Sequence, residues 1–223
     1  MSEIDRMLSD IEREVALTRR LTGKDALDER VMEAMKKVPR HLFVPRESRV
    51  VAYENGPVPI GYGQTISQPY IVALMTDLLN TQPEHVVLEV GTGSCYQSAI
   101  LSHLVKQVYT IEIVEELANQ ARERLRRLGY TNVEVRAGDG NFGWPEHAPF
   151  DGIIVTAAAP FIPQPLVDQL KPGARLVIPV GQPYLHQELM VVEKKENGEI
   201  STRDVLAVAF VPLVGGNNES KPE

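Results

Sequence analysis

Two glycines and three carboxylates carry most of the chemistry that this 223-residue chain suggests. Gly91 and Gly93 follow an apolar run over residues 86–90, and a stretch with helical spacing begins at Tyr96. A strand, a Gly-x-Gly turn and a helix form the nucleotide-binding unit of an α/β sheet. The dinucleotide fingerprint has a third glycine where Tyr96 stands, and a pyrophosphate prefers an open helix N-terminus. We therefore expect the turn to bind an adenosyl ligand without phosphates.

Each of the three carboxylates lies where a strand of such a sheet would end. Glu89 precedes the glycine turn, where it suits a sulfonium with an ammonium tail and would repel a pyrophosphate. Glu112 closes the next strand, where an acidic residue accepts the ribose hydroxyls; the alternative is a carboxylate that faces water. Asp139, between Gly138 and Gly140, follows a third strand. We expect it to accept the adenine amino group, and the alternative is an Asx-type turn.

A polar loop over residues 61–70 is the other unusual stretch, because it combines glycines with hydroxyl and amide side chains. Ser67 followed by Gln68 and Pro69 predicts a helix start, with Ser67 as the N-cap and proline in the first turn. One interpretation is a capped helix and nothing more. The other is that Ser67 and the free N–H groups beside it bind a carboxylate.

Composition and charge exclude several classes of protein. The net charge of −7 leaves no basic face for a nucleic-acid partner. A single cysteine, Cys95, excludes an internal disulfide and a multi-cysteine metal site, and the five histidines show no metal spacing. The first twenty residues are charged throughout, and no apolar run approaches the ~18 residues of a membrane span. We expect a cytoplasmic protein with no metal and no membrane partner, and take a monomer as the default.

Apolar periodicity predicts a doubly wound, mostly parallel α/β sheet with an N-terminal helical extension and a C-terminal antiparallel hairpin. The extension has a helix from a Ser2 cap to Gly23, a helix over 25–38, an irregular stretch over 39–66 and a helix over 68–79. The sheet region is predicted as strand 85–90, helix 96–105, strand 108–113, helix 114–128, strands 133–137 and 150–156, helix 163–170 and strand 175–180, with a hairpin over 189–211. The predicted division is 1–82 for the extension, 83–214 for the core and 215–223 for a frayed tail, all in one structural domain.

Six short motifs occur together and in order: PRHLFVP at 39–45, GQTISQP at 63–69, LEVGTGS at 88–94, AAAP at 157–160, LKPG at 170–173 and FVPL at 210–213. With them the chain resembles the protein-L-isoaspartate O-methyltransferase family over nearly its whole length. The glycine loop alone indicates only a Rossmann-like class I methyltransferase. Residues 64–67 together with residues 39–41 are much more specific.

The resemblance implies that S-adenosylmethionine methylates the free α-carboxylate of isoaspartyl residues in damaged proteins and peptides, which begins their repair and leaves S-adenosylhomocysteine. It also implies that Ser67 is the active-site serine. Residues expected close to the cofactor are Gln64, Thr65, Ile66, Ser67, Glu89, Gly91, Gly93, Glu112, Asp139 and Gly140. Cys95 is a departure, since the family commonly has glycine there, and we expect only a minor shift of the following helix.

The implied reaction agrees with what the chain lacks. A carboxylate of pKa ~4 is already ionised at pH 7, so it needs no general base, and a dry site that positions the reactants supplies most of the acceleration. Three alternatives stay open. A small-molecule methyltransferase would share residues 85–140, an NAD-dependent oxidoreductase is disfavoured by Tyr96 and Glu89, and a regulatory module would bind the cofactor without turnover.

Overall fold

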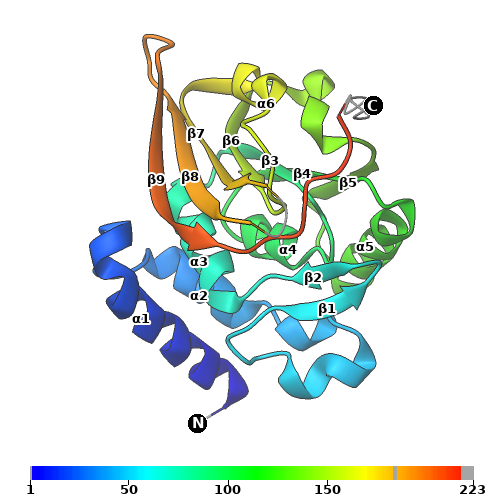
Figure 1. Ribbon diagram of the computed structural model, residues 1–223. Helices are drawn as coiled ribbons and strands as arrows, with labels where there is room; N and C mark the ends of the chain where they lie inside the picture. The colour runs from blue at the N-terminus through cyan, green and yellow to red at the C-terminus, as the bar shows by residue number, and fades with distance from the viewer. Residues whose placement is uncertain (1, 183–184, 217–223) are drawn as a thin grey trace.

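One seven-stranded sheet, in the order β5-β4-β3-β6-β7-β8-β9, forms the centre of the computed structural model, which describes residues 2–182 and 185–216 (Figure 1). The strands are β3 (Val86–Val90), β4 (Gln107–Glu112), β5 (Val133–Ala137), β6 (Phe150–Val155), β7 (Leu170–Gly181), β8 (Gln187–Lys194) and β9 (Ile200–Val208). The strands from β5 to β7 are parallel, and β8 and β9 follow as antiparallel neighbours. The predicted fold class is confirmed, hairpin included.

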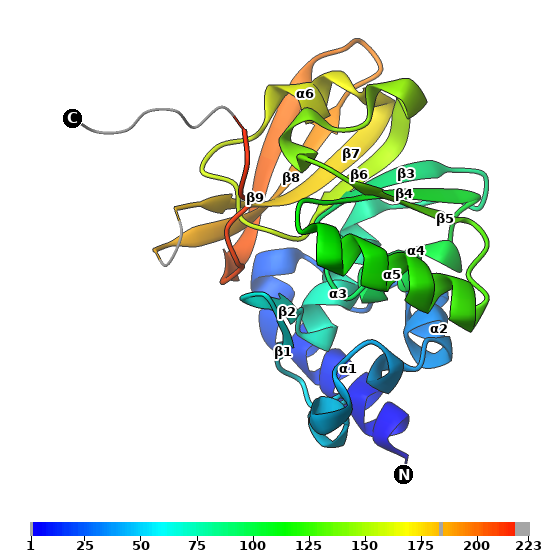
Figure 2. The ribbon, with the colours of Figure 1, turned by 90° about the vertical axis from the view of Figure 1, so that its right-hand side faces the viewer.

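The alternation of side chains along β3 shows how the two faces of the sheet are covered. Val87 packs in the same cluster as α3 (Pro69–Leu79), α4 (Tyr96–Ser102) and α5 (Glu115–Leu128). Leu88 and Val90 pack on the opposite face with the short helix α6 (Gln164–Asp168) and with Trp144. Trp144 lies between the 3-10 turns η3 (Gly140–Phe142) and η4 (Pro145–His147), which cover this face of the sheet together with α6 (Figure 2). Because strand side chains alternate, Glu89 shares the face of Val87 and points toward α4.

The N-terminal extension packs into the same core as the sheet. Helix α1 (Glu3–Thr22) begins at a capping box on Ser2 and ends at Gly23, as predicted. Helix α2 (Glu29–Lys37) is shorter than predicted, because the Asp28 carboxylate accepts the Arg30 N–H at 2.8 Å and fixes the first turn there. Buried side chains of both helices join one cluster with β3, β6 and β7, so a single hydrophobic core crosses position 82.

The stretch over 39–66 is more regular than predicted. It holds two 3-10 helices, η1 (Arg40–Leu42) and η2 (Arg46–Val51), and an antiparallel hairpin of β1 (Val58–Gly61) and β2 (Gln64–Ile66). The turn between the strands has positive φ at Tyr62 (54°) and Gly63 (71°). Two such residues in succession are the geometry of a tight hairpin, so the glycines that indicated a loop in fact mark a turn.

After β9 the chain crosses the carboxyl ends of the central strands. The Ala158 N–H donates to the Val211 carbonyl and the Leu213 N–H to the Ala158 carbonyl, both at 2.8 Å. Most of the predicted tail, residues 217–223, lies outside the described residues. In the part of the chain that the structure describes, no helix combines the length and the apolar character needed to cross a bilayer.

Candidate functional site

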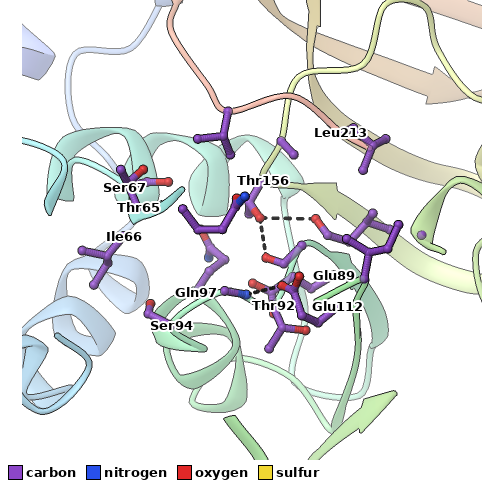
Figure 3. Close-up of a pocket in the computed structure, with 18 of the residues that line it drawn as sticks. Thr65, Ile66, Ser67, Glu89, Thr92, Ser94, Gln97, Glu112, Thr156 and Leu213 are labelled. Carbon is purple, nitrogen blue, oxygen red and sulfur yellow. Dashed lines mark hydrogen bonds between the residues drawn. The ribbon is translucent and has the colours of Figure 1, made fainter. Parts of the chain in front are cut away.

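A pocket opens at the carboxyl ends of β3, β4 and β6, where the strand order reverses between β3 and β6 (Figure 3). Ligands of open α/β sheets bind at such a reversal point. All but one of the residues predicted to lie near the cofactor line this pocket: Gln64, Thr65, Ile66, Ser67, Glu89, Gly91, Gly93, Glu112 and Gly140. They come from segments far apart in the chain, and the fold brings them together.

The floor of the pocket is the glycine turn, whose backbone leaves no space for a side chain at Gly91. Gly91 has φ of 96°, and its N–H donates to the Ile111 carbonyl at 2.9 Å. A Cβ on Gly91 would lie 2.6 Å from Oγ1 of Thr156, which itself donates to the Gly91 carbonyl at 2.5 Å. Glycine is therefore needed both for the conformation and for the close approach of β6.

Glu89 is a fully buried carboxyl beside the pocket. Its Oε2 accepts a hydrogen bond from the Ser98 hydroxyl of α4, and its Oε1 has no partner in the described ranges. Burial raises the pKa of Glu89 to about 8, although hydroxyls of Ser98 and Thr110 oppose the shift. Without a cation nearby, this carboxyl is mostly neutral at pH 7. A buried acid with a spare oxygen is suited to a ligand that brings its own positive charge.

Glu112 ends β4 and is 5% exposed. Its Oε2 accepts the Gly93 N–H at 2.7 Å, and its Oε1 accepts the Val114 N–H at 3.0 Å. An ionised carboxylate has about four acceptor positions, so two hydroxyl donors can still be accommodated. The side chain faces the pocket, so it does not match the alternative of a carboxylate that faces water.

Asp139 is the one predicted residue that does not line the pocket. Its Oδ1 accepts the N–H and the side-chain amide of Asn141, and its Oδ2 accepts the Gly216 N–H at 2.5 Å. Burial raises the pKa of Asp139, but the hydrogen bonds from Gly216 and Asn141 outweigh it, so the pKa lies below its usual range. Here Asp139 forms the Asx-type N-cap of η3, and its contact with adenine stays a prediction.

We name the two sides of the pocket for the roles proposed in the next subsection: residues 64–67 are the acceptor wall, and residues 91–94 with Glu112 are the cofactor wall. Figure 3 shows Thr65, Ile66 and Ser67 on one side of the pocket and Thr92 and Glu112 on the other. The prediction that Ser67 caps a helix is wrong: α3 begins at Pro69, its N-cap is Gln68, and no side chain caps it. Since the helix starts one residue later than a Ser67 cap requires, the Ser67 hydroxyl is free to face the pocket.

Sequence reasoning missed several pocket residues. Thr156 follows β6 directly and donates through its backbone N–H to the Val90 carbonyl at 2.9 Å, which places it beside the glycine turn. Residues 211–214 close the pocket from above as they cross the sheet. Thr156 could have been found from its position at the end of a strand that neighbours β3. That position is recognised only once the strand order is known. The signal for 211–214 was the FVPL motif.

Cys95 and Tyr96 follow the glycine turn and are fully buried, and Tyr96 also borders the pocket. The Tyr96 ring packs edge-on against Phe43 at 5.5 Å, and burial raises the pKa of its hydroxyl to about 12. Cys95 is buried with φ of 60°, a left-handed conformation that glycine adopts most easily. This conformation explains why glycine suits the position.

Comparison with known proteins identifies the family. The sequence model of protein-L-isoaspartate(D-aspartate) O-methyltransferase (PCMT) matches residues 12–218. "Protein-L-isoaspartate O-methyltransferase 2" of Nitrosococcus oceani is 67% identical over 209 residues, covering 94% of this chain and 95% of that protein. The protein of the same name from Syntrophobacter fumaroxidans is 64% identical over 95% of this chain and 86% of its own length. The chain belongs to the PCMT family.

Solved structures agree with PCMT membership. A structure described as a protein-L-isoaspartate O-methyltransferase of Plasmodium falciparum, in complex with S-adenosyl-L-homocysteine, superposes with a TM-score of 0.79 at 26% identity, covering 96% of this chain and 99% of that one. Another protein-L-isoaspartate O-methyltransferase superposes with a TM-score of 0.81 at 24% identity over 96% of this chain and 66% of that one, which shows the common fold.

The residues of this PCMT chain fit an adenosyl ligand with a positive charge. The glycine turn offers backbone in place of side chains, and a Cβ on Gly140 would clash with Val90. Glu89 holds a buried oxygen without a partner, and Glu112 presents acceptors at the next strand end. Within residues 2–182 and 185–216, no three His, Cys, Asp or Glu side chains gather as metal ligands.

Proposed function

We propose that this chain transfers a methyl group from S-adenosylmethionine to the free α-carboxylate of L-isoaspartyl residues, with Ser67 binding that carboxylate. The observation that carries the proposal is the position of Ser67. Its hydroxyl faces the pocket, serves no helix cap and has no hydrogen-bond partner in the described residues. A hydroxyl with a free proton is a donor for an acceptor-only carboxylate.

A second hollow beside the first pocket supports a route of entry for the methyl acceptor. It lies between β9 and the start of α3 and is bordered by residues 207–211, Pro57 and Ile71. This hollow shares Thr65, Ser67, Thr156 and Val211 with the first pocket, so the two meet at the acceptor wall. β9 is an edge strand of the sheet, and a peptide in extended form fits beside such an edge. We place the isoaspartyl chain in this hollow, with its carboxylate at Ser67.

The cofactor occupies the first pocket in this proposal. Glu112 accepts the ribose hydroxyls, Glu89 lies near the charged methionine part, and the glycine turn packs against the ligand. Residues 211–214 border the site where they cross the ends of the strands. Asp139 accepts the adenine amino group only where the Gly216 N–H gives up its place on Oδ2.

The chemistry needs little from the protein beyond positioning. S-Adenosylmethionine supplies an activated methyl group when bound. The acceptor carboxylate is ionised at neutral pH, so no side chain has to remove a proton. Ser67 holds one carboxylate oxygen so that the other faces the methyl group. The site shows no Cys/His or Ser/His/Asp arrangement among its lining residues, in agreement with this division of roles.

A pair of peptides tests the proposal. One sequence is made with an L-isoaspartyl and with a normal aspartyl residue, and transfer of labelled methyl from S-adenosylmethionine is measured. We expect methylation of the isoaspartyl peptide only, and an ester that is labile to base. Equal labelling of both peptides, or labelling of neither with turnover of a small carboxylic acid instead, would replace this proposal with a small-molecule methyltransferase.

We also propose that the protein works as a monomer in the cytoplasm on damaged proteins and peptides. Its single cysteine is a buried free thiol, and a chain without a disulfide is usual in a reducing compartment. Sedimentation at micromolar concentration tests the oligomeric state. A dimer that persists on dilution would overturn it.

A further inference from the structure

Arg40 is a fully buried cation without a carboxylate partner. It is 0% exposed, and no ion pair involves it anywhere in residues 2–182 and 185–216. Arginine is almost never fully buried unless it is paired, because its charge loses the solvation of water. Desolvation accordingly lowers the pKa of Arg40. Burial of this charge costs free energy of folding, so the hydrogen-bond partners of Arg40 are informative.

Three backbone carbonyls replace the missing carboxylate. The Arg40 Nε donates to the Ala52 carbonyl at 2.7 Å, and Nη2 donates to the Ser67 carbonyl at 2.8 Å and more weakly to the Gly56 carbonyl at 3.4 Å. The Ala52 and Gly56 carbonyls lie before the β1–β2 hairpin, and the Ser67 carbonyl lies directly after it. The guanidinium therefore ties both ends of the segment that carries the acceptor wall to one point.

The other side of Arg40 faces Tyr96, in the helix that follows the cofactor wall. Its Cζ lies 4.9 Å from the centre of the Tyr96 ring, and Tyr96 is the first residue of α4, directly after the glycine turn. Arg40 Nη1 and the Tyr96 hydroxyl are both buried and have no hydrogen-bond partner in the described part of the chain. The cation is thus enclosed between the segment that ends at Ser67 and the helix that follows residues 91–94.

We propose that Arg40 is a positioning residue, which fixes the backbone of Ser67 at a set distance from the glycine turn so that the acceptor carboxylate meets the methyl group. The inference rests on the proposed role of Ser67. A planar fork with donors on several edges reaches three carbonyls at once, whereas the single ammonium of lysine does not. Arg40 touches neither ligand in this account and acts through Ser67.

Arg40→Lys tests the proposal, with Arg30→Lys as the matched control. Arg30 also braces two carbonyls, those of Thr81 and Leu104 at 3.0 and 3.1 Å, but outside the lining of the proposed active site. At saturating cofactor we expect Arg40→Lys to lower kcat/KM for an isoaspartyl peptide about 10–100-fold, with the Kd of S-adenosylhomocysteine changed less than about threefold. Arg30→Lys is expected to lower the melting temperature and to leave both constants near wild type.

A double-mutant cycle distinguishes positioning from general weakening of the fold. If Arg40 acts through Ser67, adding Ser67→Gly to Arg40→Lys costs little further activity. The first change removes the Ser67 hydroxyl and the second misplaces it, so both act on its contact with the acceptor carboxylate. Three outcomes would each overturn the proposal. The first is that the losses of kcat/KM in the two single variants multiply in the double variant. The others are that Arg40→Lys keeps the wild-type kcat/KM, or that Ser67→Gly keeps it while Arg40→Lys does not. Should Arg40→Lys fail to fold, Arg40→Gln takes its place, and failure of both to fold overturns a positioning role in favour of a structural one.

Amide hydrogen exchange gives a readout that does not depend on the reaction. Exchange over residues 56–67 is expected to accelerate in Arg40→Lys and to stay unchanged in Arg30→Lys. Unchanged exchange in Arg40→Lys would overturn the inference whatever the activity. If the wild-type protein does not methylate isoaspartyl peptides, the proposed function fails. The hydrogen-exchange result then still decides whether Arg40 holds residues 56–67 in place.

Discussion

The two walls of the pocket are built in different ways. The cofactor wall is made of turns at the ends of buried parallel strands. There Thr92 and Ser94 are buried from solvent, and the Gly91 N–H donates a hydrogen bond to β4. The acceptor wall belongs to a hairpin of two strands of four and three residues, and Thr65 is exposed. A two-stranded hairpin is marginally stable alone, so the acceptor wall depends on groups such as Arg40 that hold it from behind.

This difference indicates a division of labour. The rigid wall is suited to a ligand that is the same in every turnover, and the hairpin is suited to acceptors that arrive on many protein chains. Changes in the cofactor wall are then expected to weaken cofactor binding, and changes in the acceptor wall to reduce transfer to the peptide. The predictions below test that separation, beginning with the largest effect.

Gly91→Ala is expected to abolish cofactor binding at ordinary concentrations. The left-handed backbone costs a residue with a Cβ about 1–2 kcal/mol, and overpacking against Thr156 costs about 1–3 kcal/mol more. Isothermal titration with S-adenosylhomocysteine measures the loss. Gly56→Ala is the control, because a Cβ there meets nothing within 4 Å. Unchanged affinity in Gly91→Ala would show that the turn is not the floor of the cofactor site.

Glu112→Ala is expected to weaken the binding of S-adenosylhomocysteine by about 1.5–3 kcal/mol, the range for hydrogen bonds that involve a charged group. Thermal shift at several ligand concentrations gives the change, since a ligand stabilises only the state that it binds. Neither NAD nor ATP should shift the melting temperature of the wild-type protein. Glu116→Ala removes an exposed carboxylate from the next helix and is expected to change nothing. A shift produced by NAD and not by S-adenosylhomocysteine would contradict the cofactor assignment.

Ser67→Gly is expected to lower kcat/KM for the isoaspartyl peptide about 10–100-fold, which corresponds to ~1.5–3 kcal/mol, while the melting temperature stays near wild type. The stability is preserved because Ser67 caps no helix. Steady-state kinetics and thermal denaturation of the same preparation check both halves. Full activity in Ser67→Gly would remove Ser67 from the reaction.

The pH dependence of cofactor binding tests Glu89. In the free protein the pKa of this carboxyl is about 8, and a bound cation favours its ionised form, so binding releases a proton below pH 8. The affinity for S-adenosylmethionine is therefore expected to rise about tenfold between pH 6 and pH 7 and to level off above pH 8. Titration calorimetry at each pH measures it.

Two comparisons sharpen the pH test. Glu89→Gln cannot ionise, so its affinity should be lower and independent of pH. At saturating cofactor, kcat of the wild-type protein should stay nearly flat between about pH 6 and 8, because the nucleophile is ionised and no base titrates. A flat binding profile would rule out proton release by Glu89, and a tenfold rise of kcat through pH 7 would require a base that the site does not show.

The smallest expected effect is at Cys95. Because its φ is 60°, Cys95→Gly should be more stable than Cys95→Ala by roughly 1 kcal/mol: glycine avoids the left-handed penalty and loses part of that gain to its greater freedom in the unfolded chain. Urea denaturation of the two variants measures the difference, and cofactor affinity should be similar in both. A more stable alanine variant would show that the turn relaxes around the side chain.

Much of the fold was predictable because local periodicity determines it. The predicted strand over 133–137 coincides with β5, and α5 differs from its predicted range by a single residue. The order of β8 and β9 at the sheet edge could not be predicted, since it depends on which long-range pairing buries the apolar face. The β1–β2 hairpin was missed because its strands are too short to show alternation and its glycines also suit a loop.

The residues of the candidate site were likewise predictable only in part. Glu89, Gly91, Gly93 and Glu112 were predictable because each follows from its position at a strand end. Thr156 and residues 211–214 were missed because they join the pocket only through the strand order and the crossing of the C-terminal segment. Arg40 gave no chemical signal of its own, since nothing in its spacing shows that its guanidinium reaches carbonyls up to 27 positions away.

The most direct test of the two-wall account measures both properties in the same two variants. For Glu112→Ala and Ser67→Gly, the Kd of S-adenosylhomocysteine and the kcat/KM for an isoaspartyl peptide at saturating cofactor are determined side by side. We predict opposite effects in the two variants. Glu112→Ala raises the Kd of S-adenosylhomocysteine about 10–100-fold and leaves kcat/KM for the peptide near wild type, whereas Ser67→Gly lowers kcat/KM about 10–100-fold and leaves the Kd near wild type. Equal losses of both quantities in both variants would contradict the account.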